Sequence, residues 1–553
     1  MTNNNYENLP KEELIKEIER LKKELKNKKK YGLVWEEKPE EVIEMCKHKL
    51  PILKEDKEKE IITDKEKPIN LLIEGDNYHA LSVLNYTHNK KVDVIYIDPP
   101  YNTGNKDFIF NDRYVDPEDA YRHSKWLSFM EKRLKLAKNL LKDTGVIFIS
   151  IDDNEVAQLK LLMDDKNRGM FGENNFIANL IWKSKSGGAS DSKFFAVDHE
   201  YVLVYAKNSK NFKIGLDTEA VVSTIYNLKD EKGEYALDRL DKQSLGYLPS
   251  LDFPIIGPDG KEYRVEHKNP KHKVARWRWS KDTVAERYNE LVFKWPYVYT
   301  KNYKKDGVVP RSILIDERFG RTRTGKTDLF SFFNRELFSN PKPAKLIKYF
   351  IKIIPNKDVL VLDFMAGSGT TAQAVLELNK EDGGNRKFIL CTNNENNNGN
   401  GYKIAEDICY PRIKKVIEGY KNLKGENVEG LGGNLKYFKT DFADAEPTDK
   451  NKLKLTEQAT EMLCIKEGTF ESVIDNEKFK LFKNSNHYTG IIWDQTAIPE
   501  FKKKIKDIKG KLSIYVFSLG DETFDDEFSD IKQKVQLSPI PEAILRVYRR
   551  IFK

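Results

Sequence analysis

The chain has 553 residues, which is too long for a single hydrophobic core, so about three or four domains are expected. Hydrophobic residues make up 39% of it and charged residues 33%, and no apolar run is long enough to cross a bilayer, so we expect no membrane partner. The net charge of +8 is modest for this length. Charge alone therefore neither indicates nor excludes a nucleic-acid partner.

Cysteine is scarce, and its spacing bears on the expected compartment. The four cysteines are Cys46, Cys391, Cys409 and Cys464. None stands in a Cys-x-x-Cys pair, so a disulfide framework or a structural zinc site is not expected, and the histidines show no ligand spacing either. The first residues, Met1–Glu7, lack the pattern of a signal peptide. We expect a protein of the reducing cytoplasm without a bound metal.

Residues 1–67 are expected to form an N-terminal helical segment and a linker. Between Pro10 and Lys30, apolar residues recur at helical spacing with charges elsewhere. These residues are Leu14, Ile18, Leu21 and Leu25. The pattern suits a short helical hairpin or a dimer contact and is too short for a coiled coil. The stretch from Lys54 to Lys67 is interpreted as a charged linker.

In the next region, residues 68–182, the sequence pattern predicts alternating strands and helices. We interpret this region as the first part of a catalytic domain. Apolar runs lead into Asp76 and Asp98, and a third covers Gly145–Ile151. Between the last two runs, Trp126–Leu141 carries apolar residues at helical spacing. This alternation is typical of an α/β domain with a parallel sheet.

The predicted strand Val92–Ile97 leads directly into Asp98-Pro99-Pro100-Tyr101. The carboxyl edge of a parallel sheet is where α/β folds build their sites. There the Asp98 carboxylate and the Pro99 carbonyl can each accept one N–H of an exocyclic amino group, which draws the lone pair of that nitrogen out of the ring. The Tyr101 ring offers a face for a base. These four residues are therefore catalytic candidates for methylation of a base; the alternative is an ordinary strand-to-loop turn.

From residue 183 to residue 335 the βα rhythm is lost, and Gly, Pro, aromatic and basic residues gather instead. Lys185–Asp191 is expected to be a mobile loop. Arg and Lys neutralise phosphates, and Arg also reads guanine edges, so we assign this insertion to target recognition. The candidate DNA-binding residues are Lys183, Lys185, Arg276, Arg278, Arg321 and Arg323. For any single residue the alternative is a solvated basic surface.

A phosphate-binding motif also occurs in this insertion, because Gly320–Thr327 matches Gly-x-x-x-x-Gly-Lys-Ser/Thr in full. Taken literally, it predicts a P-loop ATPase, with Asp363 as the acid that holds Mg²⁺. The context argues against that interpretation, since Asp316–Arg318 separates the motif from Ile315, whereas a P-loop follows its strand directly. Arginines inside the loop would also crowd the N–H groups that should face phosphate. The same loop can instead contact the DNA backbone.

Residues 336–425 repeat the pattern of strand, turn and helix. The apolar run Val359–Leu362 leads into a Gly-rich turn, Asp363–Thr371. The turn lacks the third glycine of a dinucleotide-binding motif, because Ala372 stands in its place. It suits S-adenosylmethionine, whose ammonium group needs a carboxylate near the turn, and Asp363 is placed for that. The other turn residues expected to contact the cofactor are Ala366, Gly367, Ser368, Gly369 and Thr370.

The last segment, residues 426–553, contains the apolar strand Leu512–Leu519 and an amphipathic helix that begins at Pro541. It is expected to form a small α+β domain that is separate from the chemistry. Before it, Asn393–Gly401 is rich in Asn and Gly and is interpreted as a loop.

The two motifs together resemble the amino-methyltransferases of DNA, in which an Asp/Asn-Pro-Pro-Tyr/Phe motif pairs with a Phe-x-Gly-x-Gly turn. In this chain Met365 stands at the usual Phe position, and Phe364 precedes it. The catalytic motif comes before the cofactor turn, an order that marks the β class, with target recognition between the two. The resemblance implies the Rossmann-like mixed α/β sheet of S-adenosylmethionine-dependent methyltransferases in permuted motif order, with an inserted target-recognition domain and a small C-terminal α+β domain.

Further segments carry the same resemblance and imply cofactor contacts. Asp76 follows a strand that resembles the one whose terminal Asp contacts the adenine of the cofactor. Phe338–Ile347 resembles the segment that binds the methionine carboxylate, which implies Lys342. Glu395 ends a strand that looks like the carrier of the ribose-binding acid. Glu200–Asn208 resembles the strand beside the target-base pocket.

The resemblance is most specific to the modification subunits of type III restriction–modification systems, through Asp98–Asn105, Phe108–Asp112 and Leu537–Phe552. It covers nearly the whole chain after about residue 65. It implies methyl transfer to N6 of an adenine flipped out of duplex DNA at a specific site, by a homodimer with a separate restriction subunit. Methylation of cytosine N4 is the alternative within this class. The alternatives outside it are the P-loop ATPase, a catalytically silent DNA-binding subunit, and methylation of RNA or protein amines.

Overall fold

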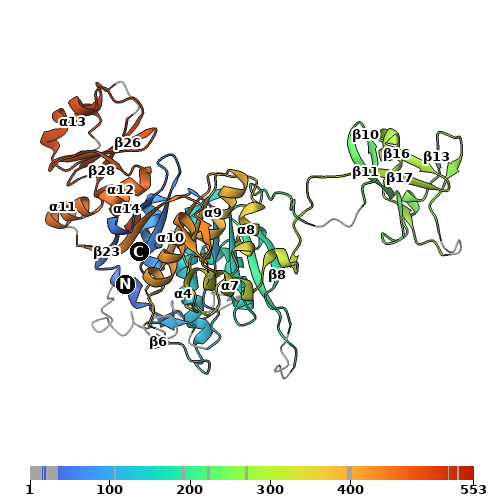
Figure 1. The fold of residues 1–553 in the computed structure, drawn as a ribbon, viewed down its shortest axis with the longest axis horizontal. Coiled ribbons are helices and arrows are strands. Elements are labelled where there is room, and N and C mark those ends of the chain that lie inside the picture. Colours follow the sequence, from blue (N-terminus) through green and yellow to red (C-terminus); the bar gives the residue numbers. More distant parts are fainter. Residues whose placement is uncertain are drawn as a thin grey trace. The chain divides into compact units, whose positions relative to one another are not determined.

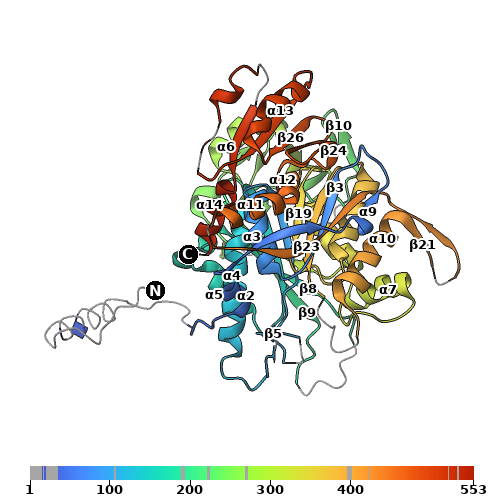
Figure 2. The same cartoon turned by 90° about the vertical axis from the view of Figure 1, so that its left-hand side faces the viewer.

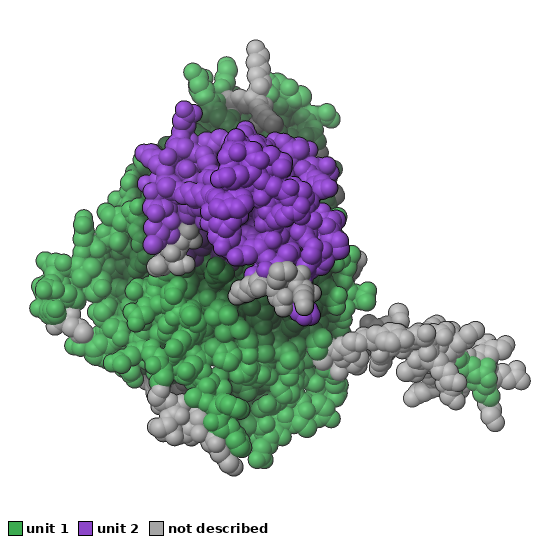
Figure 3. All heavy atoms as spheres, turned by 90° about the vertical axis from the view of Figure 1, so that its right-hand side faces the viewer, with its two compact units in different colours: residues 1–214, 311–553 green, residues 215–310 purple. Residues whose placement is uncertain are grey.

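The computed structural model describes residues 35–552, except 105–106, 112, 188–193, 221–224, 268–271, 395–400, 423, 447, 521, 523 and 532–534, together with residues 15, 18 and 19. The chain forms two compact units, coloured separately in Figure 3: residues 1–214 with 311–553, and residues 215–310. Most of the predicted N-terminal helix, including Leu14, Leu21 and Leu25, lies outside the described residues.

One mixed sheet forms the centre of the first unit (Figure 1). In spatial order its strands are β1 (Lys49–Glu55), β23 (Asn434–Asp444), β3 (Ile69–Glu74), β20 (Lys387–Thr392), β19 (Leu360–Asp363), β4 (Val92–Ile97), β7 (Leu141–Ile151), β9 (His199–Ala206), β8 (Phe176–Lys183) and β18 (Ile313–Leu314), with β2 (Ile61–Ile62) beside β23. Neighbours from β23 to β7 are parallel, whereas β9 is antiparallel to β7 and β8. The predicted α/β fold with a mixed sheet is confirmed.

The sheet is buried on both faces, which explains the continuous apolar runs of its central strands. Along β4, Val94 and Tyr96 point into one hydrophobic core, and Ile95 and Ile97 point into the other. Because successive side chains of a strand point to opposite faces, a strand that is covered twice carries apolar residues at every position.

Helices cover both faces, as Figure 2 shows. The core around Ile95 is covered by α3 (Asn77–Thr87), α4 (Arg122–Leu140) and α5 (Val156–Asp164), with α2 (Glu41–Met45) beside them. The core around Val94 is covered by α7 (Thr322–Phe333), α8 (Ala344–Lys352), α9 (Thr370–Asp382) and α10 (Tyr410–Glu418), which the π-helix η9 (Ile404–Cys409) precedes. The predicted helix Trp126–Leu141 corresponds to α4. None of the described helices is long and apolar enough to cross a membrane.

The C-terminal segment carries a second sheet. Its strands are β24 (Glu471–Asp475), β25 (Phe479–Lys483), β26 (His487–Ile492), β27 (Lys511–Phe517) and β28 (Val535–Ile540). Its helices are α11 (Asp449–Gln458), α12 (Thr460–Glu467), α13 (Ile498–Ile505) and α14 (Glu542–Ile551), with the short helices η10 (Gln495–Ala497) and η11 (Asp526–Phe528). Met462 of α12 and Tyr548 of α14 join the core around Ile95. This α+β segment is therefore part of the first unit and shares its core.

The structure corrects two sequence-based boundaries at the edge of the central sheet. The predicted charged linker Lys54–Lys67 is wrong from Lys54 to Ile62, because β1, which ends at Glu55, and β2 both pair with β23. Its charges form ion pairs instead: Lys436 of β23 contacts both Glu55 and Glu60. β23 itself falls within the predicted C-terminal segment 426–553, yet it extends the central sheet beside β3.

The second unit, residues 215–310, is narrower than the predicted insertion 183–335, since β9, β18 and α7 belong to the first unit. Its main sheet is β10 (Leu228–Asp230), β11 (Gly233–Arg239), β17 (Tyr297–Tyr303) and β16 (Leu291–Lys294). The smaller elements are β12 (Asp241–Lys242) with β15 (Arg276–Trp277), β13 (Ile255–Ile256) with β14 (Glu262–Tyr263), α6 (Lys281–Glu286), η5 (Pro249–Leu251) and η6 (Tyr288–Glu290). Trp277, Phe253 and Val298 lie in its own hydrophobic core.

Short elements complete the first unit. Among the described residues of this unit, two short hairpins stand apart from the larger sheets: β5 (Ile109–Phe110) with β6 (Arg113–Tyr114), and β21 (Gly419–Lys421) with β22 (Asn427–Glu429). The 3₁₀ turns are η2 (Lys57–Lys59), η3 (Lys166–Arg168), η4 (Glu173–Asn175) and η7 (Glu317–Phe319). The β5–β6 hairpin is the first described element of the chain after Asp98–Tyr101.

Candidate active site

The two sequence motifs lie at the ends of neighbouring parallel strands. β4 pairs with β19, with Ile95 opposite Leu362. Asp98 follows β4, and Asp363 is the last residue of β19. From this pair the sheet continues in opposite directions, to β7 on one side and to β20 on the other. In α/β folds such a reversal of strand order opens a crevice at the carboxyl ends of the strands, and both motifs lie there.

A network of charged groups surrounds the Asp98 carboxylate. The Lys342 ammonium donates to both of its oxygens, at 2.8 Å each. Nζ of Lys342 also lies 3.3 Å from Oε2 of Glu200, near the start of β9. The Tyr101 hydroxyl donates to the same Glu200 oxygen at 2.9 Å, and Nζ of Lys342 lies 4.9 Å from the centre of the Tyr101 ring. One cation is thus held between two carboxylates, beside the tyrosine.

The charges in this network depend on one another. Burial raises the pKa of Asp98, and the Lys342 charge works against that rise. Burial disfavours the charge of Lys342 as well, but Asp98 and Glu200 outweigh it, so the pKa of Lys342 lies above its ordinary value. Burial, followed by the two carboxylates, raises the pKa of Tyr101 well above its ordinary value. Near neutral pH, Lys342 is therefore charged and the Tyr101 hydroxyl remains a donor.

The two prolines of the motif are fixed between the sheet and α4. Pro99 is buried. The Pro100 carbonyl accepts a hydrogen bond from the Trp126 indole at 2.7 Å, and Trp126 is fully buried. α4 therefore holds the backbone of the loop that carries Tyr101.

The P-loop-like stretch Gly320–Thr327 has a packing role instead of a phosphate-binding one. α7 begins at Thr322, inside the motif, and the strand before it, β18, lies at the edge of the sheet. A Cβ at Gly325 would lie 2.1 Å from the Pro341 carbonyl oxygen, so glycine lets α7 approach the backbone next to Lys342. The ATPase interpretation is wrong, because these residues form a helix and closely packed backbone rather than an open loop after a central strand.

Asp363 holds the Gly-rich turn from the inside. Its Oδ1 accepts from the Met365 N–H at 3.1 Å, and its Oδ2 accepts from the Thr371 hydroxyl at 2.5 Å. Asp363 is 2% exposed, and burial raises its pKa to about 7. Gly367 and Gly369 have φ angles of 47° and 80°, in the region that favours glycine. Asp363 therefore shapes the turn, and its contact with a cofactor ammonium group stays a prediction.

Arg412 supports the same turn from α10. Its guanidinium donates to Oγ of Ser368 at 2.9 Å, to Oγ1 of Thr370 at 2.7 Å and to Oε1 of Gln373 at 2.8 Å. The side chain is fully buried, and burial lowers its pKa to about 10. Two of the predicted cofactor residues, Ser368 and Thr370, thus use their hydroxyls to anchor the turn. Residues 366–369 form the turn between β19 and α9, which begins at Thr370, and their contact with a cofactor stays a prediction.

Asp76, the predicted contact of the cofactor adenine, caps α3. Its Oδ1 accepts from the Tyr78 N–H at 2.7 Å, and its Oδ2 lies 3.4 Å from the Arg133 guanidinium. Arg133 also forms an ion pair with Glu40 at 2.6 Å. Glu395, the predicted ribose acid, lies outside the described residues. Both cofactor assignments stay predictions.

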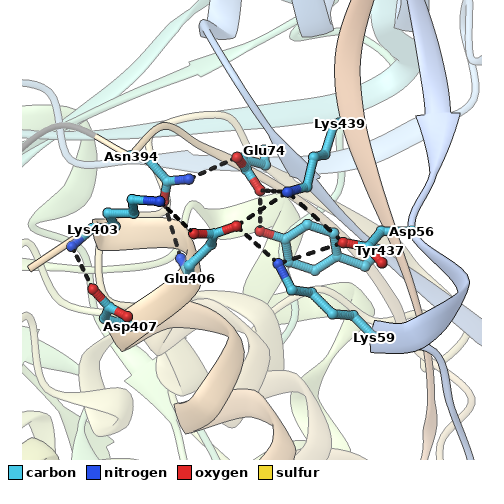
Figure 4. A network of polar contacts seen from close by, with 9 residues as sticks. All are labelled: Asp56, Lys59, Glu74, Asn394, Lys403, Glu406, Asp407, Tyr437 and Lys439. Atoms are coloured by element: carbon cyan, nitrogen blue, oxygen red, sulfur yellow. Dashed lines mark hydrogen bonds and ion pairs between the residues drawn. The ribbon is translucent and has the colours of Figure 1, made fainter.

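A polar network joins the chain just before Glu395 to the end of β3 (Figure 4). The Asn394 amide donates to Oε1 of Glu74 at 2.7 Å, and its side-chain carbonyl accepts from the Glu406 N–H at 3.1 Å. The lysines that pair with the Glu406 carboxylate are Lys403, Lys439 and Lys59. Their hydrogen bonds lower the pKa of Glu406 to about 2. Asn394 is therefore fixed at the same sheet edge as the Gly-rich turn.

The predicted DNA-binding residues are divided between the two units. Lys183, Lys185, Arg321 and Arg323 belong to the first unit, and Arg276 and Arg278 belong to the second. The Arg321 guanidinium donates to the carbonyls of Ile315 and Gly320, at 2.5 and 2.9 Å, so it stabilises its own loop. Arg278 donates to the Thr300 hydroxyl at 2.6 Å. Lys185 and Arg323 are exposed. DNA contact stays a prediction for all of them.

Glu200 and Arg412 are absent from the site residues that the sequence predicts. Glu200 lies 99 positions from Tyr101, and only the pairing of β9 with β7 brings the two together. A charged residue at the start of an apolar strand is a signal for Glu200. For Arg412 the signal is a basic residue on the apolar face of a helix that also carries Ile413 and Val416.

Comparisons with known proteins support one family. A sequence model of a protein family described as DNA methylase matches residues 92–410. The chain is 33% identical to the type III restriction-modification enzyme StyLTI Mod subunit of Salmonella typhimurium, over 65% of this chain and 59% of that protein. It is 35% identical to the type II methyltransferase M.KpnI of Klebsiella pneumoniae, over 64% of this chain and 89% of that protein.

Among solved structures, the PvuII DNA methyltransferase (cytosine-N4-specific) matches with 13% identity and a TM-score of 0.33, over 66% of this chain and 96% of that chain. The chain spans less than two thirds of the length of the StyLTI Mod subunit.

Proposed function

The chain belongs to the DNA methylase family, and on that premise we propose that it methylates N6 of adenine at a specific site in duplex DNA, with S-adenosylmethionine as the methyl donor. The observation that carries the proposal is the meeting of Asp98–Tyr101 and the Gly-rich turn at adjacent strand ends. A base-binding motif and a cofactor turn at that edge can bring an amino group and a methyl donor together.

The residues around Asp98 suit an exocyclic amino group. The Lys342 ammonium donates to both Asp98 oxygens at 2.8 Å, which shows that this carboxylate accepts hydrogen bonds from a nitrogen donor. The amino group of a base would be a second donor to the same carboxylate. A carboxylate has about four acceptor positions, so Asp98 can hold both donors. The Pro99 carbonyl is the second acceptor proposed for the amino group. The Tyr101 ring, held through its hydroxyl by Glu200, is the stacking surface for the flipped base.

The residues of the second motif fit S-adenosylmethionine. A Cβ at Gly367 would lie 3.1 Å from the Phe338 ring, and one at Gly369 would lie 3.0 Å from the Cys409 sulfur. Glycine at both positions therefore lets the turn pack closely against Phe338 and Cys409. The residues proposed to hold the cofactor are Asp76, Lys342, Asp363, Ala366, Gly367, Ser368, Gly369, Thr370 and Glu395. The cofactor supplies an electrophilic methyl group on a sulfonium.

Methyl transfer leaves an extra proton on the amino nitrogen, and we propose that Asp98 accepts it. The amino nitrogen forms the new N–C bond with the methyl carbon, whose bond to sulfur breaks, and the nitrogen must then lose one proton. Asp98, whose pKa burial raises, is placed to accept it. Lys342 keeps its own proton and balances the two carboxylates.

The partners follow from the same premise. The StyLTI relative is named as the Mod subunit of a type III restriction-modification enzyme, and we propose the corresponding role here, with a separate restriction subunit and a homodimer. The second unit and the basic residues named above are proposed to contact the DNA.

The test is methyl transfer from labelled S-adenosylmethionine to unmethylated DNA long enough to contain every short recognition sequence, followed by digestion to nucleosides. We expect the label in N6-methyldeoxyadenosine, and none with Asp98→Ala. Asp143→Ala, an exposed carboxylate of β7, is the matched control and should retain activity. Label in N4-methylcytosine would establish the cytosine alternative, and absence of label from such DNA would reject the proposal.

A further inference from the structure

Tyr101 is followed by a residue in an unusual backbone conformation. Asn102 has φ of 57°, in the left-handed region that few residues other than glycine adopt. Its side chain is 1% exposed, so it does not serve as a solvated turn residue. The loop therefore leaves the catalytic motif through a turn that is held from within the protein.

The group that holds this turn is Glu155. Nδ2 of Asn102 donates to Oε1 of Glu155 at 2.5 Å and to the Arg122 carbonyl at 3.3 Å. Glu155 precedes α5, just after β7, and β7 is the neighbour of β4. The turn after β7 thus lies beside the loop after β4, although Glu155 and Asn102 are 53 positions apart.

Glu155 has the properties of a buried, mostly protonated acid. It is 0% exposed, and burial raises its pKa to about 8. Nδ1 of His123 lies 2.7 Å from the same Oε1, whereas Oε2 is buried without a hydrogen-bond partner among the described residues. Burial lowers the pKa of His123, so this pair carries no stable ion-pair charge near neutral pH. The nearby Arg122 charge lowers the pKa of Glu155, but burial outweighs it. Burying a carboxyl in this way costs stability, so its presence needs a functional or structural explanation.

We propose that Glu155 is a positioning residue of the methyl-transfer site: it fixes Asn102, and through Asn102 it sets the place of the Tyr101 ring and the Pro99 carbonyl. The inference rests on the proposed function. The backbone on the other side of Tyr101 is held by the bond from Trp126 to the Pro100 carbonyl, at 2.7 Å. With both sides fixed and its hydroxyl bonded to Glu200, the tyrosine cannot shift without breaking one of these contacts.

The test compares Glu155→Ala with Glu155→Gln in the full chain. Glutamine keeps an acceptor for Asn102 and resembles the protonated acid, whereas alanine removes the anchor. We expect kcat to fall about 100-fold for Glu155→Ala, because a displacement of about 1 Å is enough for such a loss, and to stay within about 3-fold for Glu155→Gln. The Kd for S-adenosylmethionine, measured without DNA, should be unchanged for both, since the Gly-rich turn belongs to β19.

A matched control separates this role from loss of a buried acid in general. Glu131 of α4 is also a buried glutamate, 5% exposed and paired with Lys135, but it makes no contact with the catalytic loop among the described residues. Glu131→Ala should lower stability and leave kcat per folded molecule unchanged.

Asn102→Gly keeps the test decisive if Glu155→Ala does not fold. Glycine adopts the same φ without strain and removes only the amide. We expect a similar fall in kcat, and the double variant Asn102→Gly/Glu155→Gln should be no worse than Asn102→Gly. A wild-type kcat in Asn102→Gly, or a folded Glu155→Gln as impaired as Glu155→Ala, would overturn the inference. If the wild-type chain transfers no methyl group, the proposed function itself has failed.

Discussion

Lys342 donates to both carboxylate oxygens of Asp98, at 2.8 Å each, although the two residues are 244 positions apart in the sequence. The contact joins the stretch Asp98–Tyr101 to the segment before α8. It also gives Lys342 a role that the resemblance does not include, namely to keep an acid ionised where burial and Glu200 both disfavour its charge.

The first prediction concerns this charge. Lys342→Met removes the ammonium group that pairs with Asp98 and Glu200, so the pKa of Asp98 should rise further. Protonated Asp98 cannot accept from the amino group on both oxygens, so activity should be lost as the pH falls, and the acidic limb of the kcat profile should move up. Lys345→Met, on the exposed side of α8, is the control. An unshifted profile in Lys342→Met would contradict this role.

The second prediction separates the two functions of Tyr101. Tyr101→Phe removes the bond to Glu200 and keeps the ring, so activity should fall only a few-fold. Tyr101→Ala also removes the stacking surface, which is worth roughly 1–3 kcal/mol, and should lower kcat/KM for DNA by about 5- to 150-fold. Steady-state kinetics with DNA as the varied substrate measure both. Equal losses in the two variants would mean that the ring does not stack on the base.

The third prediction concerns Arg412. Arg412→Met leaves the hydroxyls of Ser368 and Thr370 and the amide of Gln373 buried without their donor, so the Gly-rich turn should loosen. We expect the Kd for S-adenosylmethionine to rise at least about 10-fold, with a smaller rise for Arg412→Lys, since lysine cannot reproduce the planar set of bonds. Calorimetric titration measures both. A destabilised Arg412→Met that binds the cofactor normally would contradict the role of Arg412 in shaping the turn.

The fourth prediction concerns the pH dependence of stability. The pKa of Glu155 is raised from 4.5 to about 8 in the folded protein, so between these values the folded state binds more protons than the unfolded state. Its contribution to stability therefore falls as the pH rises. Glu155→Gln removes this titration, so the difference in unfolding free energy between the variant and the wild type should grow from about pH 5 to pH 8, by at most about 1.4 kcal/mol per unit. Denaturant unfolding of both proteins at several pH values measures this difference. A difference that stays constant between pH 5 and pH 8 would contradict the raised pKa.

The sequence predicts the parts of this protein whose signals are local. The runs before Asp98 and Asp363 identify two buried parallel strands, and their motifs identify the turns after them, because each feature fits within about ten residues. The contacts of Glu200 and Glu155 with the catalytic loop span 99 and 53 positions and depend on the strand pairing, which no local pattern fixes. The segment from Lys54 looks like a linker because of its charges, and only the pairing with β23 shows it to be part of the sheet.

The most direct test of the account is to express the chain in a host without DNA methyltransferases and to map modified bases across its genome by sequencing. The account predicts N6-methyladenine at one recurring sequence, present with the wild-type chain and absent with Asp98→Ala. A genome without modified adenine at any recurring sequence, from cells that contain the folded chain, would contradict it.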